Sequence, residues 1–209
     1  MANAAPPASI DGGSRSILID EGTLARAESP TRDAVGLDAK GGSPASRAAN
    51  MADRVVSYAR HRLGQRVGDG ERFALADRAL RRAGAKSAAD FGTVTPTADY
   101  VWGTAVSLSD VRRGDVIQFR DYRYDREVVA EDTSGTTFET DFQERPHHTA
   151  IVEQVGDEGA ITVLEQNAPV GDPVTRNQLF FSSVTTASGN RTTTITVRGT
   201  FWFYRAQAR

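Results

Sequence analysis

Two neighbouring segments carry residue types that can do acid–base chemistry. His148 begins the segment HTAIVEQV, and Glu165 and Asn167 lie two residues apart in the next one, AITVLEQN. An imidazole oriented by a carboxylate or an amide can serve as the general base for a nucleophile. If both segments are strands joined by the tight turn VGDEG, Glu165 and Asn167 share one face. We then expect His148 and Asn167 to be cross-strand neighbours.

The segment VGDGERFALADRAL, residues 67–80, predicts a glycine turn that leads into an amphipathic helix. The free N–H groups of a helix N-terminus favour negative charge, so a Cys at that place would be activated. The chain has no Cys, and Arg72 stands there. A guanidinium keeps its proton and has no lone pair for attack. Glu71 and Phe73 point about 100° away around the helix, and that turn holds no Ser or Thr.

The surroundings of Arg72 allow two interpretations. It is either a surface residue tied to Asp69, Glu71 or Asp77, or it lies in a cleft. In the cleft it would pair with Glu165 or remain available to the carboxylate of a ligand, which its forked donors suit. In both cases the guanidinium needs an anion nearby, because it opposes the helix dipole.

The two histidines also allow more than one interpretation. His148 is either a hydrogen-bonded residue at a strand end or part of a buried polar network with Glu165 and Asn167. His147 should point to the opposite face, toward solvent. Adjacent strand residues diverge and no third ligand has suitable spacing, so we expect no metal and no other cofactor. Acid–base catalysis by Glu71 and Glu165 is a further alternative, which the spacing does not favour.

The elements that would position these residues follow an α+β order. The apolar spacing predicts one helix from an N-cap at Asn50 and a second one that ends at Gly84. From Tyr100 onward the apolar period is two, which predicts about six strands. They are YVWGTAVSL, DVIQFRDYRY, HTAIVEQV, AITVLEQN, RTTTITV and GTFWFYRA. We therefore expect two helices packed on an antiparallel sheet of four to six strands. The polar stretch 126–146 is either an excursion loop or a short hairpin around Ser134 and Gly135.

Composition limits the classes of function. Residues 1–48 are rich in Ala, Gly, Ser and Pro and are predicted to be disordered, which leaves one domain over 49–207. A formal net charge of −2 gives no basic surface for nucleic acid. No apolar run is long enough to span a bilayer and no secretory signal is evident, so we expect a cytoplasmic monomer that binds no membrane.

In this order of motifs the chain resembles the CHAP family of papain-like amidohydrolases and peptidases, which are related to NlpC-type cell-wall hydrolases. The resemblance runs from about Val55 to Tyr204. It comprises the glycine turn before a helix, the turn Gly114-Asp115 before a strand, the strand beginning HTAIV, and ExN on the next strand. The resemblance implies a papain-like fold with His148, Glu165 and Asn167 as members of the triad. It places Arg72 at the position of the nucleophilic Cys.

The resemblance therefore implies a catalytically inactive relative. We expect its cleft to bind a peptide, a peptidoglycan fragment or another glycan-peptide, or a partner protein, with Arg72, Glu71, Asp69 and Trp102 as binding residues. One aromatic pair of GTFWFYRA is a further candidate for the cleft. The alternative is an active amide or ester hydrolase with a non-cysteine nucleophile, or an engineered variant of a cysteine enzyme.

Overall fold

In the computed structural model, which describes residues 43–157 and 159–209, two helices are followed by a seven-stranded sheet. The helices are α1 (Pro44–Arg60) and α2 (Arg72–Ala83), and the strands follow with two short 3-10 turns among them. They are β1 (Thr104–Val106), β2 (Val116–Asp132), β3 (Gly135–Val155), β4 (Ala160–Glu165), β5 (Thr175–Phe180), β6 (Val184–Ser188) and β7 (Arg191–Arg205); the 3-10 turns are η1 (Ala88–Asp90) and η2 (Leu108–Asp110). All strand pairs are antiparallel, in the order β1-β7-β2-β3-β4-β5, with β6 on β7. The predicted α+β class is confirmed, and the sheet has more strands than expected.

The two helices form where the apolar spacing placed them, with one correction. The predicted N-cap at Asn50 is wrong, because α1 begins at Pro44 and the side chain of Ser43 accepts the N–H of Ser46 at its N-terminus. The predicted disorder of residues 1–48 is wrong for residues 44–48, which belong to α1, and residues 1–42 lie outside the described part. The end of α2 is confirmed, since Gly84 adopts the left-handed conformation of a helix C-terminus with φ 78°. No helix in the described part is long and apolar enough to cross a membrane.

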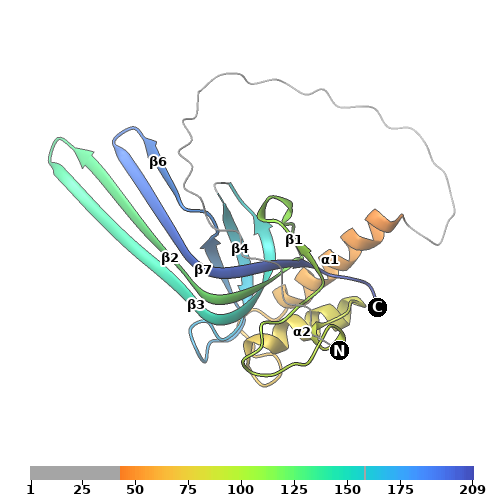
Figure 1. Cartoon of the computed structure of the whole chain (residues 1–209). Helices are drawn as coiled ribbons and strands as arrows, with labels where there is room; N and C mark the ends of the chain where they lie inside the picture. Colours follow the sequence, from red (N-terminus) through yellow and green to blue (C-terminus); the bar gives the residue numbers. More distant parts are fainter. Residues whose placement is uncertain (1–42, 158) are drawn as a thin grey trace, which may run out of the picture.

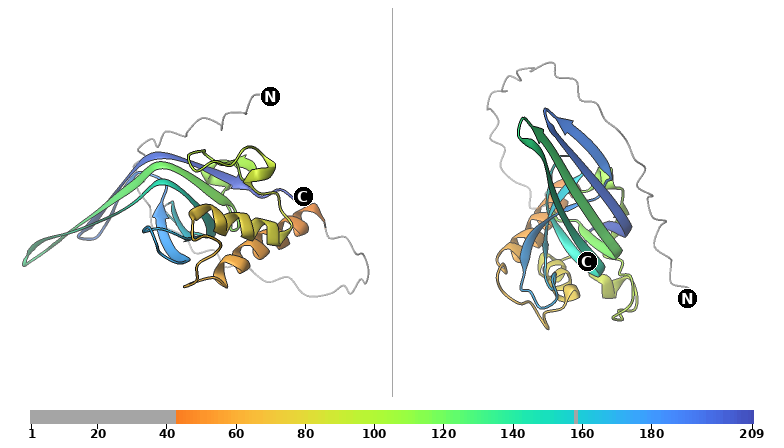
Figure 2. Two further views of the ribbon diagram at one scale, coloured as in Figure 1. Left: turned by 90° about the horizontal axis from the view of Figure 1, so that it is seen from below. Right: turned by 90° about the vertical axis from the view of Figure 1, so that its left-hand side faces the viewer.

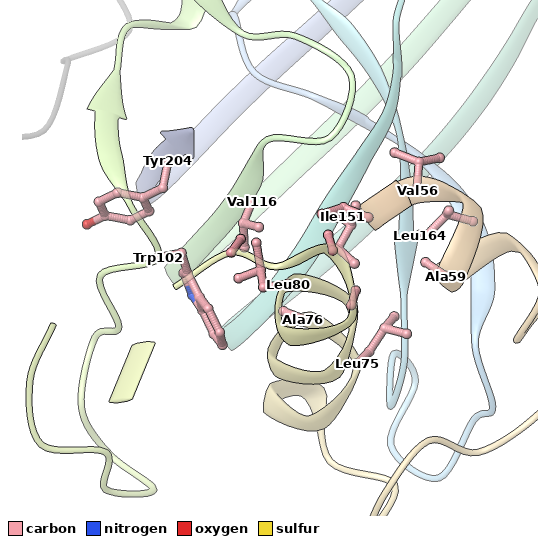
Figure 3. Packing of buried hydrophobic residues seen from close by; sticks show 14 of the residues in the cluster. Val56, Ala59, Leu75, Ala76, Leu80, Trp102, Val116, Ile151, Leu164 and Tyr204 are labelled. Atoms are coloured by element: carbon pink, nitrogen blue, oxygen red, sulfur yellow. The ribbon is translucent and has the colours of Figure 1, made fainter. Parts of the chain in front are cut away.

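The part of the sheet that lies beside the helices is buried on both faces. Alternate residues of each central strand contact the helices on one side and a second apolar cluster on the other. Figure 3 shows Val116, Ile151 and Leu164 beside the helix residues. Their chain neighbours, among them Ile117, lie in the second cluster. The period-two alternation predicted for GTFWFYRA is confirmed. Phe201 and Phe203 lie in the second cluster, and Trp202 and Tyr204 lie in the cluster beside the helices.

β2, β3 and β7 extend far beyond the helices and form, together with β6, a projecting arm (Figures 1 and 2). The stretch 126–146 is therefore a hairpin whose turn holds Ser134, as one alternative predicted, and it continues both strands. The arm bends where Asp121 has φ 53° and Gly199 has φ 91°. A Cβ on Gly199 would lie 2.1 Å from the carbonyl oxygen of Asp121, so only glycine permits this approach.

Candidate functional site

The turn before α2 is held by a residue that sequence reasoning missed. Gln166, which follows β4 and is fully buried, accepts the N–H of Val67 at 2.6 Å. Its amide also donates to the carbonyl oxygens of Val67 and Glu71. Asp69 accepts the N–H of Glu71 at 3.0 Å inside the turn. The turn and the first residue of α2 are therefore fixed relative to the end of β4.

Arg72 is the first residue of α2 and contacts His147. Its Nη2 lies 3.1 Å from Nδ1 of His147, while Nε2 of the same ring lies 2.9 Å from the carbonyl oxygen of Ala98. The carbonyl can only accept, so Nε2 carries the proton and Nδ1 accepts from the guanidinium. Burial lowers the pKa of His147, and the charges of Arg120 and Arg72 lower it further. The ring is therefore neutral.

This contact corrects the expected arrangement of the two histidines. His147 was expected to face solvent, yet its side chain is only 11% exposed and lies on the helix side of the sheet. His148 lies on the other side, where its ring is 6.2 Å from that of Phe119. Both faces of the sheet are buried, so alternation alone did not show which histidine meets α2.

His148 is buried beside Glu165. Its Nε2 lies 3.0 Å from Oε2 of Glu165, but no well-aligned hydrogen bond joins them. Burial lowers the pKa of His148 despite the adjacent carboxylate. The ring is thus a neutral group next to a charged one.

Glu165 is the centre of a buried polar network. It is fully buried, and it accepts both Nε and Nη2 of Arg145, with the Nε contact at 2.8 Å. Asn177 donates to it at 2.8 Å. Burial alone would raise the pKa of Glu165, but the Arg145 hydrogen bonds and the adjacent His148 lower the pKa to about 2. Glu165 is therefore ionised and paired with Arg145, so the alternative in which it pairs with Arg72 is wrong.

Asn167 does not share a strand face with Glu165, because β4 ends at Glu165 and Asn167 has φ 66°. Its Oδ1 accepts the N–H of Gly171 at 2.6 Å, and its Nδ2 donates to Glu71 at 3.2 Å. The amide shapes a loop and orients no histidine. Trp102 is fully buried against Phe73, so it does not reach a ligand.

Arg72 lines a cleft of about 750 Å³ between α2, β3 and the loop after β4. The lining residues are Arg72, Phe142, Gln143, Glu144, Arg145, Pro146, His147, His148, Asn167, Ala168, Pro169, Val170 and Asn177. No Ser, Thr, Cys or Lys is among them. No carboxylate within residues 43–157 and 159–209 forms an ion pair with Arg72. Asp69, Glu71, Trp102 and the aromatic residues of β7 are not part of the lining.

The residues that contact one another at this site are therefore not those of the predicted triad. His148, Asn167 and Arg72 do line one cleft, and Glu165 lies directly beneath it. The imidazole next to Arg72 belongs to His147, however. Arg145 and Gln166 were missed because neither motif nor spacing marks them. The described residues contain no group of three or more His, Cys, Asp or Glu side chains that could hold a metal ion.

Comparison with known proteins gives the family. No curated protein and no solved structure matches the chain. A family model described as the AIM3/BBC1 cysteine proteinase-fold domain matches residues 45–186. That match covers α1 through most of β6 and more than half of the chain. The two-helix and sheet architecture agrees with a papain-like cysteine proteinase fold, and the chain belongs to the AIM3/BBC1 cysteine proteinase-fold domain family.

Proposed function

We propose that this domain is a papain-like protein without hydrolytic activity, whose cleft binds a carboxylate of a peptide or protein ligand. The proposal rests on the position of Arg72. This residue lines the cleft at the N-terminus of α2, and its guanidinium is hydrogen-bonded to the neutral imidazole of His147. His147 accepts one N–H of the Arg72 guanidinium and carries no negative charge. The other N–H groups of the guanidinium therefore suit a carboxylate. The helix N-terminus favours the same charge.

The proposed loss of catalysis rests on the residue types in the cleft. Arg72 stands at the first helical residue after a glycine turn, where CHAP-type hydrolases carry their nucleophilic Cys, and we propose that the two positions correspond. The pairing of this residue with a histidine on a neighbouring strand supports that correspondence. The cleft lining within the described residues also lacks the hydroxyl that an alternative nucleophile would need, which argues against an active hydrolase.

Exposed apolar side chains lie in the same cleft as the guanidinium of Arg72. Val170 is 90% exposed and Phe142 is 56% exposed, and both line the cleft. The guanidinium of Arg123 stacks on the ring of Phe142 at 4.0 Å and holds it in place. A ligand with a carboxylate next to an apolar side chain fits this combination.

The test uses peptides selected from a random library on the full chain. Each selected peptide is compared with variants in which its carboxylates become amides. Charge-assisted hydrogen bonds contribute roughly 1.5–3 kcal/mol, so losing the critical carboxylate should weaken binding about tenfold or more. Arg72→Ala should weaken the acidic peptide equally and abolish its advantage over the amide. Arg78→Ala removes an exposed arginine of α2 that lies outside the cleft lining, and it should leave binding unchanged. Equal binding of acid and amide forms to the unaltered chain contradicts the proposal.

A further inference from the structure

The longest strand of the sheet has a free edge over more than half of its length. β3 pairs with β2 from Gly135 to Ile151, but its pairing with β4 covers only Ala150 to Val155. In the part of the chain that the structure describes, no strand pairs with the other edge of β3 between Gly135 and Glu144. Unpaired backbone groups of this kind are a template for a further strand.

The pairing shows which backbone groups point to the free edge. The N–H of Glu131 donates to Asn190, on the β7 side of β2, so Glu131 does not bond to β3. Its partner Thr136 therefore also points away from β2, because opposed residues of an antiparallel pair turn the same way. The register continues without a shift to Arg123 opposite Glu144. Every second residue along this segment thus turns its N–H and C=O outward, namely Thr136, Phe138, Thr140, Phe142 and Glu144. Of these groups, the carbonyl oxygen of Glu144 already accepts Nη1 of Arg145.

The free edge leads directly into the cleft. Phe142, Gln143 and Glu144 belong to both the edge segment and the cleft lining. Phe138, four residues nearer the tip, is 68% exposed and has the same orientation as Phe142. A strand laid along this edge would pass two aromatic side chains and arrive at Arg72.

The charges of the segment decide between two occupants. Gly135–Glu144 carries three carboxylates and no Lys or Arg, and each carboxylate is ion-paired with an arginine of β2 or β7. A second copy paired antiparallel about Thr140 would place Glu139 opposite Asp141, and like charges directly opposite each other are destabilising. A peptide without acidic side chains opposite Glu139 and Asp141 meets no such repulsion. The carboxylates of the edge are already paired, so the cationic cleft at its end selects the occupant and favours a segment that has a carboxylate there.

We propose that the edge Gly135–Glu144 of β3 binds an extended peptide segment of another protein as an added strand, which places a carboxylate of that segment at Arg72. The backbone hydrogen bonds supply affinity, and the alternate side chains supply specificity. The carboxylate contact rests on the function proposed for the cleft, whereas the strand addition depends only on the edge.

The test compares two substitutions at Thr140 with the library-selected peptides. Thr140→Pro removes an edge-facing N–H and no bond to β2, whereas Thr140→Val keeps the N–H and a similar shape. We expect Thr140→Pro to weaken binding at least about tenfold and Thr140→Val to leave it unchanged. Circular dichroism and the melting temperature check that both variants are folded. As a second measurement, peptide addition to the unaltered chain should slow hydrogen exchange at the edge-facing amides.

Each result is decisive. Unchanged exchange at these amides, or equal binding by the Pro and Val variants, overturns the strand addition. A library that yields no binder, or light scattering that shows a dimer disrupted by Thr140→Pro, also overturns it, the latter in favour of a second copy on the edge. Binding that is sensitive to Thr140→Pro but insensitive to Arg72→Ala supports the strand addition and contradicts the carboxylate site alone.

Discussion

Replacing Glu165 by Gln should destabilise the fold strongly, because among the described residues its carboxylate is the one negative charge that pairs with the buried guanidinium of Arg145. The pKa of Glu165 is about 2 instead of the usual 4.5, and one pKa unit corresponds to 1.36 kcal/mol. Ionised Glu165 therefore contributes about 3 kcal/mol at neutral pH. The side chain of Arg145 is only 7% exposed, and removing one partner of a buried ion pair costs roughly 3–5 kcal/mol. Both routes give a loss of at least about 3 kcal/mol.

Urea unfolding followed by fluorescence measures this loss. With a slope of about 2 kcal/mol per M, the midpoint should fall by about 1.5 M. Arg145→Met combined with Glu165→Gln should cost clearly less than the sum of the two single substitutions, because the pair is then removed together. A Glu165→Gln variant within about 1 kcal/mol of the unaltered chain would refute the buried ion pair.

The same carboxylate predicts a dependence on pH. Its pKa is lower in the folded chain than in the unfolded chain, so the unfolded chain binds more protons between these values. The stabilisation is complete above about pH 4.5 and is lost as the pH falls toward 2. Glu165→Gln should flatten the stability profile in this window.

Two further predictions concern the cleft cation and the arm. Arg72→Ala should raise the pKa of His147 in an NMR titration, because the guanidinium charge is one cause of its lowered pKa; an unchanged titration would place the guanidinium away from that ring. Gly199→Ala should destabilise the chain by roughly 2 kcal/mol or more in thermal unfolding, since its Cβ would collide with the carbonyl of Asp121. Gly189→Ala, also at positive φ but with nothing within 4 Å, should cost about 1 kcal/mol, and equal losses would contradict the close approach at the bend.

The fold could be predicted where local patterns determine it. α2 and its end at Gly84 follow from apolar spacing and one glycine, and the central strands follow from their alternation. β5 and β6 were missed because their residues are mostly polar and gain strand structure from pairing. The arm was predicted only in part. The first half of β3, Gly135–Glu144, is mostly polar and exposed, so no apolar alternation marks it in the sequence.

The cleft brings together some of the predicted site residues and not others. The start of α2 and the strand that carries the histidines do meet at one cleft with Arg72. Which of two adjacent histidines meets Arg72 depends on which face of the sheet the helices cover, and both faces are apolar. The place of Asn167 depends on where β4 ends, and Arg145 becomes a partner of Glu165 only because β3 passes beside the end of β4. These are tertiary effects that motif spacing does not contain.

The most direct test of a cleft that binds without cleaving is mass spectrometry of one selected peptide kept with the unaltered chain. Native spectra report the complex, and denatured samples taken over time report the peptide mass. The account predicts that the peptide binds and is recovered intact. Accumulation of peptide fragments that His147→Ala abolishes would contradict it.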